Sequence, residues 1–560
     1  MQRRDFLKLL SIGGSSLLLP KTGGARALLI TQKSTQSVPN YEGIDRLLKF
    51  AQPLPIPGFL KPVSKKNGKL EYRVRMMQFQ QKLHPQLPPA TLWGFEGKYP
   101  GPVIEGMVNE PMSVEWVNQL PPKHLYEIDS TLHGAMPPAP AVRTVTHLHG
   151  AHTASEDDGL PEKWFTPGKS VVYHYPNQQR AATLWYHDHA LGITRLNNYA
   201  GLSGMYFLRG EEEKKLGLPE GPYEIPLVLQ DRLLNDEGHL IYSASSMTTI
   251  RIAPGVWGPE FFGNVPVING AILPFLEVEP RRYRFRVVNA ANSRFFGLVF
   301  SDPKIPFENT AMKFTQIGTD GGLMPQPVDV GAVMLGPGER ADLIVDFAGQ
   351  EGKRLILGNF APAPLPGSGA DESPMKAAGL RQLMEVRVTA PLRSKDTSAK
   401  PDWTVPFEKL KPESAVKTRD LVLYEYLDDQ QNSHGLKINN LGYDAPVTET
   451  PKLNTTEIWR FINTTDDTHP IHLHLVQFQI LDRKSFVLEK FLATGEIEFS
   501  GRVRPPEKNE MGWKDTVRVN PKEVVSIIVP FTGYTGKYVY HCHMLEHEDN
   551  DMMRPFQVMP

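Results

Sequence analysis

Apolar and polar residues alternate along several stretches of the chain, and no long run has the apolar period of an amphipathic helix. The stretch VEPRRYRFRVVN places Tyr283, Phe285 and Val287 on one side of an extended chain. Arg284 and Arg286 fall on the other side. This alternation predicts a half-buried strand, so the chain is expected to consist mainly of β-strands.

Two strand-like phrases recur along the chain, which indicates an internal repeat. The first phrase ends on asparagine and occurs as NEPMSVEWVN (109–118), as the central stretch (278–289) and as NTTEIWRFIN (454–463). The second phrase occurs as AATLWYHDH (181–189), as GKRLILGNF (352–360) and as GKYVYHCH (536–543). A chain of 560 residues is also too long for one apolar core. We therefore predict three related β-domains, at residues 28–210, 211–390 and 391–560, the last beginning with a linker.

The amino-acid composition limits the kinds of partner that the protein is expected to bind. Lys plus Arg (61) nearly balances Asp plus Glu (62), so no bulk charge points to nucleic acid or to an anionic membrane. Fifty prolines and 46 glycines fit many turns between short strands. A single cysteine cannot form an internal disulfide. Partners must therefore be inferred from local sites, and stable membrane insertion is not expected.

The first 27 residues have the layout of an export signal. Arg3 and Arg4 precede an apolar run from Leu9 to Leu19, and Ala25-Arg26-Ala27 fits a cleavage site. The apolar run is too short to span a bilayer. RRDFLK resembles the twin-arginine signal, which implies the twin-arginine export machinery as a partner and a periplasmic or extracellular location. A general secretory signal and a frayed amphipathic helix are the alternatives.

Ten of the 17 histidines occur in four clusters. The clusters are HLH (His147, His149), HDH (His187, His189), HPIHLH (His469, His472, His474) and HCHMLEH (His541, His543, His547). On a strand, the two histidines of H-x-H share one face about 6.6 Å apart, which suits ligands of neighbouring metals. The same rule turns Cys542 to the face opposite His541 and His543, so this cysteine can serve one metal while its neighbours serve others.

Copper is the metal that this donor set favours. Two histidines, one cysteine and a distant methionine form the blue-copper set, and Met552 follows His547 at a short distance. Structural zinc normally has more thiolates, and catalytic zinc needs only three protein ligands. Core or surface histidines would explain any one pair, but not all four clusters in this order.

The motifs HLHG, LWYHDHALGITRLNNYAGLSG, THPIHLH, GWKDTV and HCHMLEHEDNDMMRP resemble those of multicopper oxidases with three cupredoxin domains, as in bacterial spore-coat laccases and bilirubin oxidases. The resemblance implies an all-β chain of three consecutive cupredoxin-like Greek-key β-sandwich or barrel domains. It also implies four copper ions, with no other cofactor. The type 1 copper would be bound by His469, Cys542, His547 and the axial Met552, the type 2 copper by His147 and His472, and the type 3 pair by His149, His187, His189, His474, His541 and His543.

By this resemblance, electrons enter through an exposed edge of His547, cross Cys542 and reduce dioxygen to water. Glu548 and Asp158 match acidic positions that the family uses to supply protons. The alternatives are a solvated acidic turn for Glu548 and a turn cap before Gly159 for Asp158.

The expected substrates are phenols, aromatic amines or a bilirubin-like tetrapyrrole. Oxidation of cuprous or other metal ions is an alternative, disfavoured because the 18 methionines form no tract. A copper-stabilised binding protein of the envelope is a further alternative.

Overall fold

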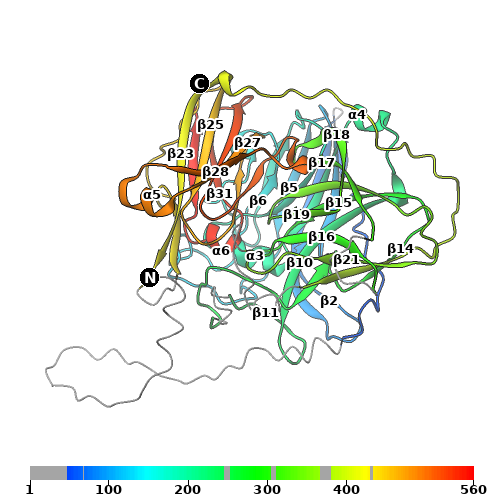
Figure 1. Cartoon of the computed structure of the whole chain (residues 1–560). Coiled ribbons are helices and arrows are strands. Elements are labelled where there is room, and N and C mark those ends of the chain that lie inside the picture. The colour runs from blue at the N-terminus through cyan, green and yellow to red at the C-terminus, as the bar shows by residue number, and fades with distance from the viewer. Residues whose placement is uncertain (1–46, 67–68, 245–251, 304–310, 366–379, 429–432) are drawn as a thin grey trace, which may run out of the picture. The chain divides into compact units, whose positions relative to one another are not determined.

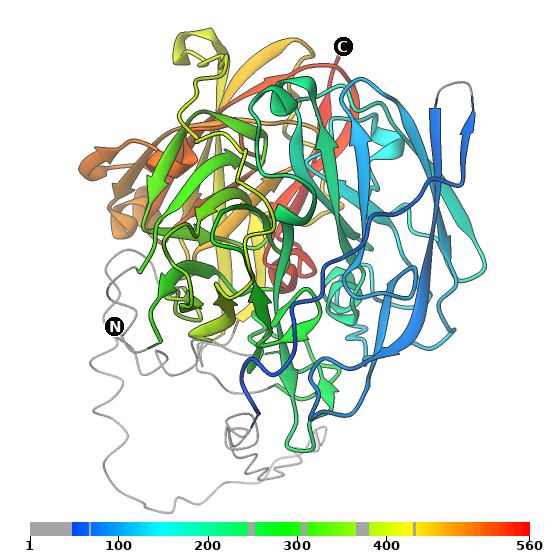
Figure 2. The ribbon, with the colours of Figure 1, turned by 90° about the vertical axis from the view of Figure 1, so that its right-hand side faces the viewer.

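The computed structural model describes residues 47–66, 69–244, 252–303, 311–365, 380–428 and 433–560. Nearly all of its regular structure is β-strand (Figures 1 and 2). The α-helices of this part are short: α3 (Thr194–Ala200), α4 (Glu211–Lys215), α5 (Leu488–Thr494) and α6 (Leu545–Glu548). Its 3-10 turns include η2 (Ser155–Asp157), η3 (Gly221–Tyr223), η5 (Pro412–Ser414) and η6 (Lys508–Glu510). The predicted all-β class is confirmed.

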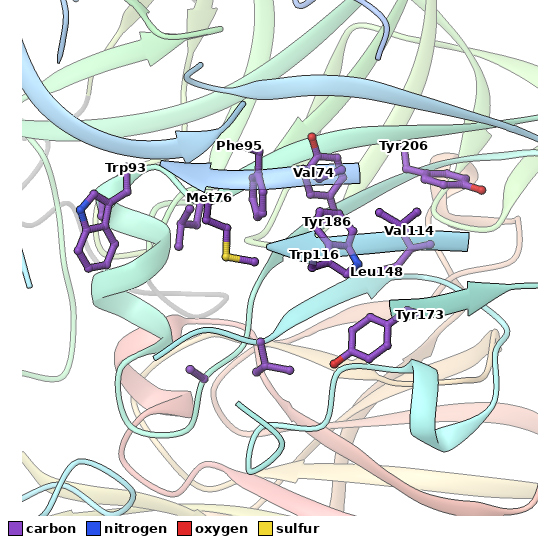
Figure 3. Packing of buried hydrophobic residues seen from close by; sticks show 14 of the residues in the cluster. Val74, Met76, Trp93, Phe95, Val114, Trp116, Leu148, Tyr173, Tyr186 and Tyr206 are labelled. Atoms are coloured by element: carbon purple, nitrogen blue, oxygen red, sulfur yellow. The ribbon is translucent and has the colours of Figure 1, made fainter. Parts of the chain in front are cut away.

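Two sheets come from the first third of the chain. Their strands are β1 (Ser64–Lys66), β2 (Lys69–Gln81), β3 (Ala90–Phe95), β4 (Gly101–Met107), β5 (Met112–Asn118), β6 (Thr146–His149), β7 (Ser170–Tyr175), β8 (Ala182–Asp188) and β9 (Ser203–Arg209). One sheet has the order β1-β2-β5-β7 with β3 paired to β2, and the other has the order β4-β9-β8-β6. Phe95, Trp116 and Tyr186 pack with tilted or edge-on rings in the apolar core (Figure 3).

The middle third also forms two sheets around its own apolar core. The strands are β10 (Glu224–Leu234), β11 (Leu240–Ile241), β12 (Val265–Ile268), β13 (Ala271–Ile272), β14 (Phe275–Glu277), β15 (Arg282–Asn289), β16 (Phe296–Ser301), β17 (Phe314–Thr319), β18 (Gly322–Val330), β19 (Ala332–Leu335), β20 (Arg340–Asp346), β21 (Arg354–Asn359) and β22 (Gln382–Arg387). The orders are β13-β12-β10-β15-β20-β17-β18, with β11 on β10, and β14-β22-β21-β16-β19.

The last third repeats the plan. Its strands are β23 (Ala415–Leu427), β24 (Ser433–Ile438), β25 (Thr455–Asn463), β26 (His469–Leu473), β27 (Gln479–Phe486), β28 (Phe499–Arg504), β29 (Thr516–Val519), β30 (Glu523–Phe531), β31 (Gly536–Cys542) and β32 (Met553–Val558). The sheet orders are β24-β23-β25-β30-β27-β28 and β29-β26-β31-β32. Cys542 and Met552 lie in the apolar core of this third. The chain thus forms three consecutive β-sandwiches.

The asparagines that end the recurring phrases have one structural role. Asn118, Asn289 and Asn463 are buried at the ends of β5, β15 and β25. The side-chain oxygen of each accepts a hydrogen bond from the backbone N–H two residues later, at 3.0, 3.0 and 2.9 Å. Each of these strands also pairs in parallel with an earlier strand, β2, β10 or β23. The repeat seen in the sequence therefore corresponds to the same turn and pairing in all three sandwiches.

The prediction that β15 is only half-buried is wrong. Tyr283, Phe285 and Val287 face the core, but Arg284 and Arg286 are buried as well. Their guanidinium groups form ion pairs with acidic side chains that include Glu213, Glu224 and Asp342. Arg286 also donates to Thr183 on β8, at 3.1 Å. The polar face of this strand is covered because it packs against the first sandwich.

The predicted export signal lies outside the described residues, and the three domain boundaries stay predictions. Residues 391–411, all of them described, form no helix or strand. Among the residues that the structure describes, no helix has the length and apolar character needed to cross a membrane.

Candidate metal centres

Four strands carry most of the clustered histidines. β6 pairs with β8, which places His147 opposite His187. β26 pairs with β31, which places His472 opposite His541 and Ile471 opposite Cys542. Because alternate residues of a strand share a face, Cys542 points into the apolar core of the last sandwich while its two histidine neighbours point the other way. The predicted opposition across this strand is present.

One group consists of His469, Cys542 and His547. The Cys542 sulfur lies 3.5 Å from Nδ1 of each histidine, and the two Nδ1 atoms are 3.2 Å apart. Met552 is buried, and its backbone accepts a hydrogen bond from Cys542 N and donates one to His547 O, both at 3.0 Å. The structure therefore brings these four predicted residues to one place.

The other eight clustered histidines, from the first and last sandwiches, converge in a second centre. Their nitrogens form overlapping sets, each within 4.8 Å: His149, His187 and His543; His189, His474 and His541; His147, His472 and His474. The Nε2 atom of His541 lies 3.2 Å from that of His189 and 3.3 Å from that of His474. Two of the sets correspond to the halves of the predicted type 3 pair, and the third contains both predicted type 2 residues.

Hydrogen bonds fix the opposite nitrogens of most of these rings. Backbone carbonyls accept from Nδ1 of His147, His187, His472 and His541 at 2.6 to 3.1 Å. The carboxylates of Asp158 and Asp515 bind His474 Nδ1 at 2.7 Å and His149 Nε2 at 3.0 Å. Such outer contacts set the tautomer and orientation of a ligating imidazole.

The inward-facing nitrogens are available to a metal. His147 Nε2, His187 Nε2, His472 Nε2 and His149 Nδ1 are buried without a hydrogen-bond partner among the described residues. Burial, reinforced by the neighbouring histidines, lowers the pKa of His147, His149 and His187 well below the usual value. These rings are therefore neutral and present lone pairs, as metal ligands must.

Burial shifts the pKa of the Cys542 thiol in the opposite direction to that of the histidine rings. Burial raises the pKa of Cys542 well above its usual value. A metal that binds this sulfur must therefore displace its proton, which couples metal binding to proton release.

Asp158 is not a simple turn cap. Its side chain is buried, its carboxylate binds His474, and its backbone carbonyl binds His147. Burial raises its pKa well above the usual value. Asp158, a residue of the first sandwich, thus contacts two histidines of the eight-histidine centre.

Glu548 does not lie in a solvated turn either. Glu546, Glu548 and Asp549 are all buried. The Glu548 carboxylate oxygens lie 3.5 Å from Nδ1 of His189 and 3.2 Å from Nδ1 of His541. Burial raises the pKa of Glu548 to about 7 against the opposing effect of His189. A carboxyl group in this position can exchange a proton near neutral pH.

The expectation of an exposed edge on His547 is wrong. His547 has 0 % of its surface accessible, and so does His469. The loop that precedes β12 lies against α6, where Trp257 Nε1 donates a hydrogen bond to the Glu546 carbonyl at 2.9 Å. An electron donor must therefore act across at least one layer of protein.

The sequence reasoning missed Asp515, although it lies in the quoted GWKDTV motif. Asp515 binds His149 through its carboxylate and His472 through its backbone carbonyl. Arg340 of the middle sandwich donates two hydrogen bonds to the same carboxylate, at 2.7 and 2.5 Å. Burial favours the neutral acid, but Arg340 and His149 hold the pKa of Asp515 well below its usual value. A buried ion pair thus links the middle sandwich to the histidine centre.

Three β-sandwiches that hold a His₂Cys group next to an eight-histidine centre define a class of copper oxidoreductases. Comparison with known proteins supports the assignment to this class. Two family models, both described as multicopper oxidase, match residues 140–213 and 416–560. A laccase of Bacillus subtilis (strain 168) is 44% identical over 91% of this chain and 99% of its own length, and a laccase of Bacillus stratosphericus is 40% identical over 92% and 99%.

A solved structure of a laccase from Pediococcus acidilactici Pa5930 superposes with a TM-score of 0.71 at 27% identity, covering 92% of this chain and 95% of that one. The chain therefore belongs to the multicopper oxidase family. It is a copper-dependent oxidoreductase that uses dioxygen as its acceptor, built from three cupredoxin-like domains.

Proposed function

We propose that this chain couples one-electron oxidation of phenols, aromatic amines or a tetrapyrrole to the four-electron reduction of dioxygen to water. The observation that carries the proposal is the position of Cys542. It belongs to the His₂Cys group, while the adjacent His541 and His543 belong to two different halves of the eight-histidine centre. Two centres joined by a few covalent bonds suit transfer of single electrons from one to the other.

Four copper ions would supply the electron transfer and the oxygen chemistry when bound. His469, Cys542 and His547 would hold the type 1 ion, with Met552 as the axial ligand, and His147 and His472 the type 2 ion. The type 3 pair would be held by His149, His187, His543, His189, His474 and His541. The neutral rings and unpartnered inward nitrogens support this assignment.

The carboxyl groups around the histidine centre orient histidine rings, supply protons, or do both in this proposal. Asp158 and Asp515 orient His474 and His149. Glu548, beside His189 and His541, delivers protons toward the site of oxygen reduction, and Asp158 takes part in the same relay. Each electron that reaches dioxygen must be matched by a proton for water to form.

The same sequence features that suggest export support a proposal about location. Arg3 and Arg4 followed by the apolar run fit transport by the twin-arginine machinery to the periplasm or the outside.

Oxygen uptake with a phenolic dye tests the function directly. The copper-loaded protein should consume one dioxygen for every four electrons taken from the dye, without releasing hydrogen peroxide. A panel with bilirubin, Mn(II) and Cu(I) then ranks the substrate classes. Absence of oxygen uptake with every donor would instead favour the copper-stabilised binding protein, and peroxide release would refute the four-electron step.

A further inference from the structure

One ring of the eight-histidine centre, that of His543, lacks the outer contact that the others have. Each of the other seven rings has a backbone carbonyl or a carboxylate within 3.5 Å of one of its nitrogens. Neither ring nitrogen of His543 has a hydrogen-bond partner in another residue of the described chain. Since such partners normally orient a ligating imidazole, the orientation of the His543 ring must come from packing.

Trp185 of β8 supplies one of the packing contacts. Its ring lies 5.5 Å from that of His543, centroid to centroid. It also stacks on the His187 ring at 4.3 Å and lies tilted against the His149 ring at 5.3 Å. Trp185 is buried, and its Nε1 atom has no hydrogen-bond partner among the described residues. The indole therefore acts on these three rings, which form one of the histidine sets, by contact rather than by hydrogen bonding.

Gly338 of the middle sandwich supplies a second contact. A Cβ atom on Gly338 would lie 2.8 Å from Cδ2 and 2.9 Å from Cγ of His543, and 3.1 Å from Cε1 of His149. The first two distances are shorter than real Cβ contacts allow. Gly338 also has a φ of +86°, a conformation that glycine adopts without strain. The backbone thus approaches both rings as closely as a residue without a side chain permits.

The turn that carries Gly338 (336–339) is anchored to both sandwiches that supply the histidines. Glu339 forms an ion pair with Lys514 of the last sandwich at 2.9 Å. Arg340, directly after the turn, donates a hydrogen bond to the Gly338 carbonyl at 2.9 Å and another to the Thr183 carbonyl of the first sandwich at 3.0 Å. These contacts fix the distance between the turn and the rings.

We propose that Gly338 and Trp185 are positioning residues for His543, an inference that rests on the proposed four-copper assignment. The described residues of the middle sandwich supply no member of either centre. Through Gly338, this sandwich nevertheless controls copper binding at the set of His149, His187 and His543. A methyl group on Gly338 would turn the His543 ring, and turning breaks no hydrogen bond to another residue. It does move the ring nitrogens away from the other two histidines, so the loss falls on copper binding more than on folding.

Gly338→Ala in the full-length protein tests the inference, and Gly349→Ala is the matched control. Gly349 lies in another turn of the same sandwich with a φ of +73°, but a Cβ atom there would have no atom within 4 Å. Both variants carry the backbone strain of alanine at positive φ. Only Gly338→Ala also brings a methyl group against the histidine rings. The two metal-free variants should therefore melt at similar temperatures.

Copper binding should separate the two variants. Each protein is equilibrated with buffers that fix the concentration of free Cu(II), and bound copper is counted at each concentration. The eight-histidine centre of Gly338→Ala should need about 10- to 100-fold more free copper than that of the native protein, the effect of losing a group that orients a metal-binding histidine. Gly349→Ala should bind as the native protein does. The thiolate absorption of the His₂Cys group should be unchanged in both variants.

Trp185→Phe tests the other contact independently of the turn. It shortens the ring but removes no hydrogen bond, because Trp185 Nε1 has no partner among the described residues. It should weaken copper binding at the eight-histidine centre and keep the thiolate absorption.

Native copper affinity at this centre in Gly338→Ala or in Trp185→Phe would overturn the inference. Equal losses in Gly338→Ala and Gly349→Ala would overturn it too, because backbone strain alone would then explain them. If Gly338→Ala does not fold, Trp185→Phe decides. A native protein that binds no copper at the eight-histidine centre would instead refute the four-copper assignment itself.

Discussion

Replacing Asp515 by asparagine should disturb the histidine centre and leave the His₂Cys group intact. The Asp515 carboxylate accepts two hydrogen bonds from Arg340, one from His149 at 3.0 Å and one from the Thr516 hydroxyl at 2.9 Å. An asparagine keeps one acceptor oxygen but turns donor hydrogens toward Arg340, which has no acceptor. The buried guanidinium then loses its hydrogen-bonded counter-charge and keeps only the Asp320 carboxylate, 3.7 Å away.

Two effects follow from this geometry. Breaking a buried ion pair costs about 3–5 kcal/mol. At about 2–4 °C per kcal/mol for a domain of this size, the metal-free protein should melt roughly 6 to 20 °C lower. Loss of the group that orients His149 should weaken copper binding by about 10- to 100-fold, which corresponds to about 1.4–2.7 kcal/mol.

Melting of the metal-free protein and copper titration against a competing chelator measure the two effects. Asp346→Asn is the control. Asp346 lies on β20, as Arg340 does, but its side chain is half-exposed and pairs with Arg282 at 3.5 Å. An exposed pair of this kind contributes about 0–1 kcal/mol. If Asp515→Asn melts and binds copper as the native protein does, the ion pair does not support the histidine centre.

Four further variants test the proposed function and location. Glu548→Gln should lower turnover by about 10²-fold with copper content intact, because an amide cannot release a proton, and Asp158→Asn should act similarly; native turnover with full copper would exclude the relay. Met552→Leu should keep the blue absorption and raise the type 1 potential, because the oxidised ion loses a weak thioether ligand, and a lower potential by redox titration would contradict the axial role. Lysines at Arg3 and Arg4 should retain the protein inside the cell, as fractionation would show, whereas normal export would favour the general secretory route.

The residues that converge in the two centres were predictable because their signal is local. Alternation along β31 places Cys542 and its histidine neighbours on opposite faces, so three adjacent residues reveal two centres. The strands that end on Asn118, Asn289 and Asn463 likewise show the threefold repeat directly in the sequence. A local sequence pattern is sufficient for such a prediction where the strand itself fixes the direction of each side chain.

The remaining features depend on contacts between distant segments. Arg340 and Asp515 are 175 residues apart, so no periodicity links the ion pair to the histidine centre. The charged face of β15 was expected to be exposed, but packing between sandwiches covers it. The ring of His547 was expected to have an exposed edge, but it is buried. Tertiary packing, which sequence alternation does not encode, decides these points.

The most direct test of the two-centre account is the copper content and visible spectrum of Cys542→Ser beside the native protein. The native protein should bind four coppers per chain and show the intense absorption of a thiolate-bound type 1 ion. Cys542→Ser should lose that absorption and keep the coppers of the eight-histidine centre, because none of its ligands is changed. An unchanged blue band in Cys542→Ser, or a native protein that binds a single copper, would contradict the account.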